Sequence, residues 1–320
     1  MISLYDCSNS EERPKTRGNG GPVKNDIIRY LQEYAGSYGC QFVSEPGKAD
    51  VFLTNDVFPS SILKYDRPRV KRMDGVFWDK KYMERNVPLN RAASQADHVI
   101  FISQYSQDSY FGLYGDELKS FSVCLNQADP SVFFNGPDTN ELIFVATANS
   151  WEREEKRFND IVSFAYHVWE SIILIGSIPP HVNLPSNIHA TGYLSSPEDI
   201  SSSLRRGSVF VNFSYRDPAP KTVCQALCCG LPVLYANSGG VPELVEGFGV
   251  SIVDNSPMEF GDKTPDMADQ DISRGTYEIR AKFETLREQV KHRDNVDKFK
   301  KMLDGYFQIF TKITSVRSLK

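Results

Sequence analysis

The stretch that decides the fold is residues 208–243, which read SVFVNFSYRDPAPKTVCQALCCGLPVLYANSGGVPE. Its apolar start predicts a strand over 208–213, and a proline-rich turn at 216–220 leads into a predicted helix. A second apolar run at 232–235 predicts the next strand, and a glycine pair then opens another helix. Strands that alternate with helices indicate a parallel sheet. Both helix N-termini then lie beyond the carboxyl ends of neighbouring strands, where unpaired N–H groups favour an anion.

The length and composition are those of a soluble protein with two domains. The chain has 320 residues, of which 40 % are hydrophobic and 24 % are charged. A net charge of −5 argues against a nucleic-acid partner. Residues 280–320 carry eleven Lys or Arg against five Asp or Glu. This basic tail indicates either peripheral contact with an anionic membrane or a phosphate-bearing acceptor, or a solvated helix face.

The cysteines and the apolar runs indicate the compartment. Six cysteines form no C-x2-C pair, so we expect them to pack as small apolar residues in a reducing environment. No charged leader precedes a long apolar run, and no run is long enough to span a bilayer. The sequence therefore predicts a cytoplasmic protein.

The first half of the chain repeats the alternation of strands and helices. A short strand at 1–5 leads through a glycine-rich loop, Arg17–Pro22, into a helix with a periodic apolar face. Only glycine lets a backbone come so close to a ligand, although such a loop also serves simply as a tight turn. Helices are predicted near 79–95 and 104–114. Further strands are predicted at 41–44, 50–54, 69–73, 98–102 and 121–124.

The second half opens after a linker, Asn135–Asp138. Strands are predicted at 142–146, 172–176 and 187–190, with a polar loop over 147–155. A helix then begins near Lys156 and runs to Trp169. The chain ends in two helices, of which the last carries an apolar face made by Val296, Phe299, Leu303, Tyr306, Phe307 and Phe310.

These segments together resemble retaining glycosyltransferases of the GT-B fold, in the large group called family 4. That family reads Glu-x7-Glu, then Cys/Ala-Gly-x-Pro-Val, then Gly-Gly-x-Pro-Glu. The matching positions here are Asp217 and Gln225, then Gly230 to Val233, then Gly239 to Glu243. The resemblance covers nearly the whole chain in order, and its main departure is the replacement of the two glutamates by Asp217 and Gln225.

The resemblance implies a donor site in the second half of the chain. The first acid of the family contacts the donor sugar, a role that falls to Asp217, and the second binds ribose hydroxyls. Gln225 keeps an acceptor oxygen, so ribose contact survives at lower strength. Lys156 matches the lysine that pairs with the donor diphosphate. The implied donor-binding residues are Gly20, Gly21, Lys156, Gly192, Asp217, Ala219, Pro220, Lys221, Thr222 and Gln225.

Two features of this donor site stay open. The arginine that the family places before Lys156 is replaced by Ala146-Thr147, and either Arg153 or Arg157 takes its part or both are solvated charges. Asp217 is also a good helix-capping residue, so the alternative to sugar contact is a cap.

The run Val70–Gly75 ends a strand with charges, which makes it a candidate site because a buried charge is costly without a partner. It resembles the Arg-x-Asp-Gly of a subset of the family, where other members place a His that contacts the transferred sugar. The resemblance implies a catalytic, sugar-facing role for Asp74, beside Asp217 and Lys156. A structural Arg72–Asp74 pair is the alternative. His98 lies in a strand similar to the family's and is expected to pack rather than to act in catalysis.

The fold implied is α/β, of the GT-B type: two Rossmann-like parallel-sheet domains facing a central cleft. The expected domains are 1–137 on the acceptor side and 138–295 on the donor side, with a C-terminal helix at 296–320 that returns to the first domain.

The activity implied is transfer of a sugar from a nucleoside diphosphate to an acceptor hydroxyl, with retention of configuration. The expected partners are the nucleotide sugar and a glycan, lipid-linked or protein acceptor. No cofactor is expected, and no carboxylate cluster suggests a metal. The departing diphosphate would then be stabilised by Lys156, the amides of Gly18–Gly21 and the helix start at 219–222.

Two rival functions remain: a GT-B sugar-nucleotide epimerase, and a non-catalytic subunit that binds nucleotide sugars. An NAD-dependent enzyme is not indicated, because no G-x-G-x-x-G follows a strand and opens a helix with an acid about twenty residues on.

Overall fold

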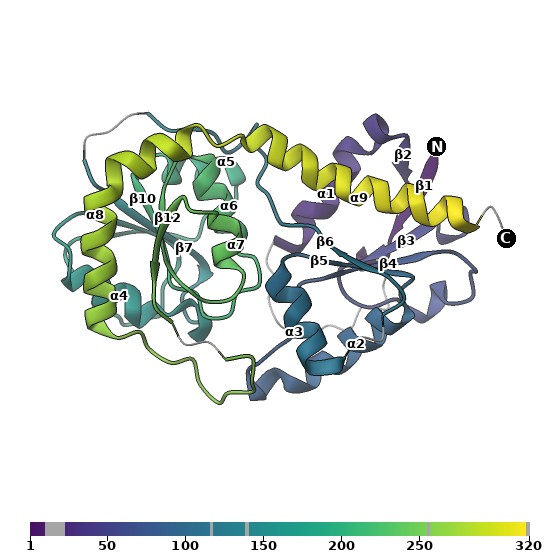
Figure 1. Ribbon diagram of the computed structural model, residues 1–320, viewed down its shortest axis with the longest axis horizontal. Coiled ribbons are helices and arrows are strands. Elements are labelled where there is room, and N and C mark those ends of the chain that lie inside the picture. The colour runs from purple at the N-terminus through teal and green to yellow at the C-terminus, as the bar shows by residue number, and fades with distance from the viewer. Residues whose placement is uncertain (10–22, 116–117, 138–140, 255–256, 318–320) are drawn as a thin grey trace. The chain divides into compact units, whose positions relative to one another are not determined.

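A computed structural model describes residues 1–9, 23–115, 118–137, 141–254 and 257–317 (Figure 1). The chain forms two compact units. Unit 1 comprises Met1–Leu125 with Lys300–Lys320, and unit 2 comprises Asn126–Phe299. Within the described ranges each unit carries one six-stranded sheet in which all paired strands are parallel. The predicted α/β class with two Rossmann-like units is confirmed.

In unit 1 the sheet has the order β2-β1-β3-β4-β5-β6. Its strands are β1 Ile2–Asp6, β2 Cys40–Phe42, β3 Val51–Thr54, β4 Arg69–Met73, β5 His98–Phe101 and β6 Phe121–Val123. Its helices are α1 Val23–Tyr34, α2 Asn86–Gln95, α3 Gln104–Tyr114 and most of α9 Asn295–Arg317. Helices α2 and α3 lie on one face of the sheet, and α1 and α9 on the other (Figure 1).

The predicted helix at 79–95 is divided in the structure. A 3-10 turn, Lys80–Arg85, precedes α2, which begins only at Asn86. Pro88 is the physical reason, because it lacks an amide hydrogen and fits an α-helix only in its first turn. The Asn86 side chain also fixes this start, accepting from the Phe77 amide at 2.8 Å and donating to the Phe77 carbonyl at 2.9 Å.

Helix α9, yellow in Figure 1, has the predicted apolar face except at its start. Leu303, Tyr306, Phe307 and Phe310 are buried, whereas Val296 is 66 % exposed. Within unit 1 the Tyr38 ring stacks on Phe307, with centroids 4.3 Å apart, which packs this end of α9 onto the unit. The final helix therefore belongs for most of its length to unit 1.

In unit 2 the sheet has the order β12-β11-β10-β7-β8-β9. Its strands are β7 Phe144–Ser150, β8 Ile172–Ser177, β9 Ile188–Gly192, β10 Val209–Asn212, β11 Val233–Ala236 and β12 Gly249–Ile252. Its helices are α4 Phe158–Tyr166, α5 Pro197–Leu204, α6 Lys221–Cys228, α7 Val241–Val245 and α8 Asp269–Lys291. The chain crosses from β9 back past β8 and β7 to β10, so the sheet order reverses between β7 and β10.

Strand β7 runs further than predicted, because the segment expected to be a polar loop still pairs with β8 as far as Ser150. The register shifts after Thr147. Trp151 anchors the extension: it is buried, and its indole nitrogen donates to the carbonyl of Ile175 at 3.0 Å. Strand β12 lies where no strand was predicted, since only two of its residues, Val250 and Ile252, are apolar.

The two units divide between Leu125 and Asn126, rather than after residue 137. The reason is that the segment after Leu125 is bound within unit 2. The Cys224 thiol lies 3.1 Å from the carbonyl of Asn126, and the Ser201 hydroxyl donates to the carbonyl of Val132 at 2.8 Å. Helix α9 contributes its first residues to unit 2 and the rest to unit 1. None of the helices in the described ranges combines the length and the apolarity needed to cross a membrane.

Candidate functional site

The site in unit 2 forms where the order of its sheet reverses, a point at which open parallel sheets bind ligands. Lys156 ends the 3-10 turn Glu154–Lys156, which follows β7, and Asp217 lies in the turn that follows β10. The lysine ammonium donates to the Asp217 carboxylate at 2.7 Å and lies 3.5 Å from the Ser214 hydroxyl. The side chains are 14 % and 20 % exposed respectively. The structure thus joins two residues that the sequence predicted separately.

The backbone of Asp217 is held by the glycine loop after β11. The amide of Gly240 donates to the carbonyl of Asp217 at 3.0 Å, and the amide of Arg216 donates to the Ser238 hydroxyl at 2.8 Å. A Cβ atom at Gly239 would lie 2.2 Å from the Asp217 carbonyl oxygen, and Gly239 also has φ +64°. Only glycine fits there. The Gly-Gly motif therefore braces the turn that presents Asp217.

The capping interpretation of Asp217 is wrong. Helix α6 has Pro220 at its N-cap, and no side chain there accepts a capping hydrogen bond. The Asp217 carboxylate accepts from Lys156 instead. Proline at the cap explains this, since its fixed φ starts the helix without a side-chain acceptor.

The residues predicted to bind the donor around the start of α6 lie together. Ala219 and Pro220 are buried, whereas Lys221, Thr222 and Gln225 keep part of their surface exposed. The side-chain amide of Asn126 donates to the carbonyl of Ala219 at 3.0 Å, which fixes the segment just before the helix. The sequence missed this role of Asn126 and that of Ser214, since neither residue type at a turn signals its distant partner.

Both neighbouring arginines have partners other than Asp217. Arg157 is buried and binds both carboxylate oxygens of Asp254, at 2.9 and 3.1 Å. It also donates to the carbonyl of Pro265 at 2.9 Å. Arg153 donates to Glu155 at 2.6 Å on the surface. Of these three basic side chains, Lys156 is the one that reaches Asp217.

The other predicted donor residues are not gathered at this pair. Gly192 ends the edge strand β9, with φ +75°, and β8 and β7 separate that strand from β10. Gly20 and Gly21 lie outside the described residues. Elsewhere in the described ranges, no group of three or more His, Cys, Asp or Glu side chains is placed to hold a metal. The expectation of a metal-free reaction stays a prediction.

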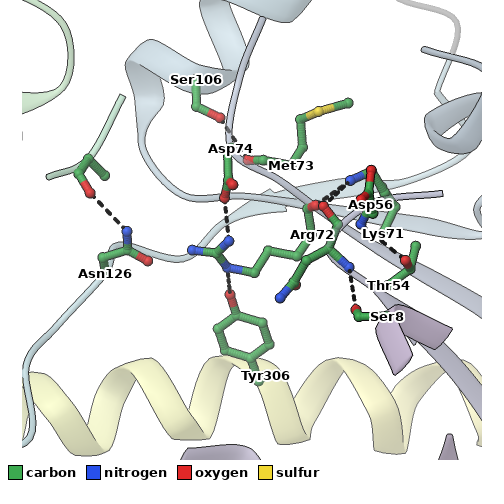
Figure 2. Close-up of polar contacts among 12 residues, drawn as sticks. Ser8, Thr54, Asp56, Lys71, Arg72, Met73, Asp74, Ser106, Asn126 and Tyr306 are labelled. Atoms are coloured by element: carbon green, nitrogen blue, oxygen red, sulfur yellow. Dashed lines mark hydrogen bonds and ion pairs between the residues drawn. The ribbon is translucent and has the colours of Figure 1, made fainter. Parts of the chain in front are cut away.

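The site in unit 1 lies at the carboxyl end of β4, where Asp74 follows the strand (Figure 2). The Arg72 guanidinium forms an ion pair with the Asp74 carboxylate, and its Nε donates to the Tyr306 hydroxyl at 3.1 Å. The Arg72 side chain is 4 % exposed and that of Asp74 is 40 % exposed. The predicted Arg72–Asp74 pair is therefore present, and the sugar-facing role of Asp74 stays a prediction.

Two consecutive residues of β4, Lys71 and Arg72, are buried cations. The Lys71 side chain is fully enclosed, and its ammonium donates to the carbonyls of Asn55, at 3.0 Å, and Arg72, at 2.7 Å (Figure 2). Burial lowers the pKa of the Arg72 guanidinium, but Asp74 and Tyr306 more than reverse this, so Arg72 stays charged. The strands of a parallel sheet are normally apolar on both faces. Two charged residues on β4 are therefore unusual, and they single out the end of this strand as a candidate site.

His98 packs as expected. Its ring nitrogens lie 2.9 Å from the hydroxyls of Ser120 and Ser122, on the loop before β6 and on β6 itself. Burial, with a smaller contribution from Lys312, lowers the pKa of His98 to about 4. The imidazole is therefore neutral near pH 7 and has no place in the site.

Comparison with known proteins supports the resemblance. The family model described as "Glycosyl transferases group 1" matches residues 180–283. No curated protein matches the sequence at a significant level. Among solved structures, WaaG, a glycosyltransferase involved in lipopolysaccharide biosynthesis, is similar over 97 % of this chain and 100 % of its own, with 11 % identity and a TM-score of 0.70.

Two further solved structures are also similar to this chain over nearly its whole length. Sucrose-phosphate synthase from Thermosynechococcus elongatus is similar over 98 % of this chain and 89 % of its own, with 13 % identity and a TM-score of 0.67. Anabaena HepE in complex with UDP-glucose is similar over 99 % of this chain and 100 % of its own, with 14 % identity and a TM-score of 0.67. The chain therefore has the fold of these proteins, and placement in family 4 stays a prediction.

Proposed function

We propose that this chain, which has the GT-B fold and carries the group 1 glycosyl transferase region, moves a sugar from a nucleoside diphosphate to an acceptor hydroxyl. The observation that carries the proposal is the Lys156–Asp217 pair at the point where the sheet order reverses. A cation and a carboxylate there match the two chemical parts of a nucleotide sugar, an anionic diphosphate and a polyhydroxylated ring.

Lys156 would stabilise the departing diphosphate. An ammonium has three N–H donors, and this one donates to Asp217 and lies near Ser214, so a further donor can serve a phosphate oxygen. Negative charge builds on that oxygen as the glycosidic bond breaks, and a preorganised cation lowers the barrier. Asp217 keeps Lys156 oriented and can accept from a sugar hydroxyl.

Several finer features belong to the proposal. Asp74 would face the transferred sugar, the configuration would be retained, and no metal would be required. The acceptor would be a glycan, a lipid-linked sugar or a protein, and the enzyme would be cytoplasmic, with its basic C-terminal residues able to touch an anionic membrane. HepE has been solved with UDP-glucose and with UDP, which makes a uridine nucleotide the first donor to try.

The test is a panel of UDP, GDP and CMP sugars, with nucleotide release measured with and without sugar acceptors. Lys156→Ala should lower kcat about ten- to a hundredfold, because the transition state then lacks one charge-assisted hydrogen bond to the diphosphate. Arg153→Ala is the matched control, since Arg153 is a basic residue beside the same turn whose partner is Glu155. Equal turnover in wild type and Lys156→Ala would contradict the role of Lys156.

A non-catalytic subunit that binds nucleotide sugars is the second candidate. The replacement of both family glutamates, by Asp217 and Gln225, favours it. It predicts saturable binding of a nucleotide sugar without nucleotide release. An epimerase would instead change the sugar without any acceptor, so product analysis separates the three functions.

A further inference from the structure

We propose that Tyr306 is a positioning residue, whose hydroxyl orients the Asp74 carboxylate for sugar transfer through the guanidinium of Arg72. The inference rests on the proposed function for the step that Asp74 serves. The residues come from two distant parts of the chain, the end of β4 and helix α9, and meet within unit 1 (Figure 2).

The geometry links three side chains in series. The Tyr306 hydroxyl accepts from Nε of Arg72 at 3.1 Å, and Nη1 of Arg72 pairs with Oδ1 of Asp74. A guanidinium is a planar fork, so fixing Nε also fixes the direction in which Nη1 points. Because Tyr306 and Arg72 are both buried while Asp74 is partly exposed, rigid groups hold a carboxylate that can meet a ligand.

The backbone at Asp74 is fixed from the other side. The Ser106 hydroxyl, in the first turn of α3, donates to the carbonyl of Met73 at 3.1 Å (Figure 2). Gly75 then has φ +126°, which lets the chain turn away directly after the carboxylate. With the backbone fixed in this way, the ion pair with Arg72 acts on the side-chain rotation of Asp74.

Packing alone does not account for the hydroxyl of Tyr306. Its neighbours on the buried face of α9, Phe307 and Phe310, fill space without a polar atom. A phenol hydroxyl in a buried position is costly unless it is hydrogen-bonded. Burial also raises the pKa of this hydroxyl, so it stays neutral and accepts from Arg72 without adding a charge.

The experiment compares Tyr306→Phe with Tyr38→Phe. Tyr38 offers a matched control because its hydroxyl also links α9 to the rest of unit 1, donating to Asp304 at 2.7 Å rather than accepting from Arg72. Each variant removes one hydroxyl that links α9 to another element of unit 1. We expect Tyr306→Phe to lower kcat about tenfold with the KM for the donor changed less than about twofold. Tyr38→Phe should leave kcat unchanged, even if it lowers Tm by as much as Tyr306→Phe does.

Equal decreases of kcat in the two variants, or no decrease in Tyr306→Phe, would overturn the proposal. Crystal structures of both variants give a readout that needs no activity. In Tyr306→Phe the Arg72–Asp74 ion pair should break or Asp74 should rotate, whereas in Tyr38→Phe the pair should persist. An intact pair in Tyr306→Phe overturns the positioning role. A wild-type protein that transfers no sugar overturns the proposed function, and the crystallographic comparison still decides whether Tyr306 holds Asp74.

Discussion

Asp217 in unit 2 and Asp74 in unit 1 both follow a strand of a parallel sheet and pair with a cation, but they are held in different ways. The partner of Asp217 is Lys156, which comes from another loop and keeps some exposure. The partner of Asp74 is Arg72, which lies on the strand just before it and is buried. In the proposed function the cation of unit 2 keeps its bond to Asp217 and offers a further N–H donor to an anionic ligand. In unit 1 the cation is fixed, and the carboxylate is the group presented.

The contacts that hold the two carboxylates in place also differ. The Asp217 turn depends on backbone contacts with a glycine loop, whereas Asp74 depends on side chains of Arg72, Tyr306 and Ser106. A backbone support fails when a Cβ atom is added, and a side-chain support fails when a polar atom is removed. The two sites should therefore respond to different substitutions.

The largest effect is expected for Gly239→Ala, which adds a methyl group against the Asp217 carbonyl in a left-handed conformation. We expect a decrease of about 3–4 kcal/mol in unfolding free energy, measured by urea denaturation, together with loss of nucleotide-sugar turnover. Gly247→Ala is the control, because Gly247 has φ +89° but no atom lies within 4 Å of its added Cβ. It should cost only about 1 kcal/mol. Similar decreases in both variants would show that strain, rather than the clash with Asp217, dominates.

Removing each cation sharpens the contrast between the sites. Arg72→Met leaves the buried Tyr306 hydroxyl without its donor and should cost about 2–4 kcal/mol of unfolding free energy. Lys156→Met breaks a partly exposed pair and should cost about 1 kcal/mol, while it weakens binding of UDP. Denaturation and calorimetric titration measure the two quantities. If Lys156→Met loses stability but keeps its affinity for the nucleotide, Lys156 is a structural cation, as Arg72 is.

Within unit 2, substitutions at Gln225 and Asp217 should distinguish contacts with the nucleotide from contacts with the donor sugar. Gln225→Ala should weaken UDP binding by about 1 kcal/mol, or about fivefold in Kd, through loss of one neutral hydrogen bond. Gln225→Glu should tighten UDP binding, because a carboxylate accepts ribose hydroxyls more strongly. Asp217→Asn should leave UDP affinity nearly intact and lower turnover of the nucleotide sugar. Titration of UDP into all three variants decides this, and equal Kd values for wild type and Gln225→Ala would remove Gln225 from the site.

A pH dependence is expected in unit 1 from His98, a partly buried base held between two hydroxyls. The pKa of His98 is about 4 in the folded protein and about 6.5 in an unfolded chain, so between these values the unfolded state binds more protons. The stability that His98 contributes is thus present above pH 6.5 and is lost as the pH falls toward 4. Tm measured over that range should fall less in His98→Gln. His292→Gln, at an exposed position beside Glu288, is the control and should follow wild type.

Much of the fold could be predicted, because alternating strands and helices leave a local pattern of apolar residues. The predicted β4 has the observed limits, and the predicted β3, β5 and β8 differ from the structure by one residue at a single end. The segments placed less well carry few apolar residues: β12 has only Val250 and Ile252, and the end of β7 depends on the buried Trp151. Local periodicity carries no information on such segments, since distant contacts stabilise them.

By itself the sequence determined the two α/β units and the residue types at the sheet edge beside 208–243. Only the tertiary structure decided which of those residues meet. Lys156 and Asp217 are 61 residues apart, and Arg72 and Tyr306 are 234 apart. Tyr306 appears in the sequence only as one more member of an apolar helix face, and Lys71 only as a charge near a strand end. The physical reason is that burial follows from the pattern along one element, whereas the partner of a buried polar atom is set by how separate elements pack.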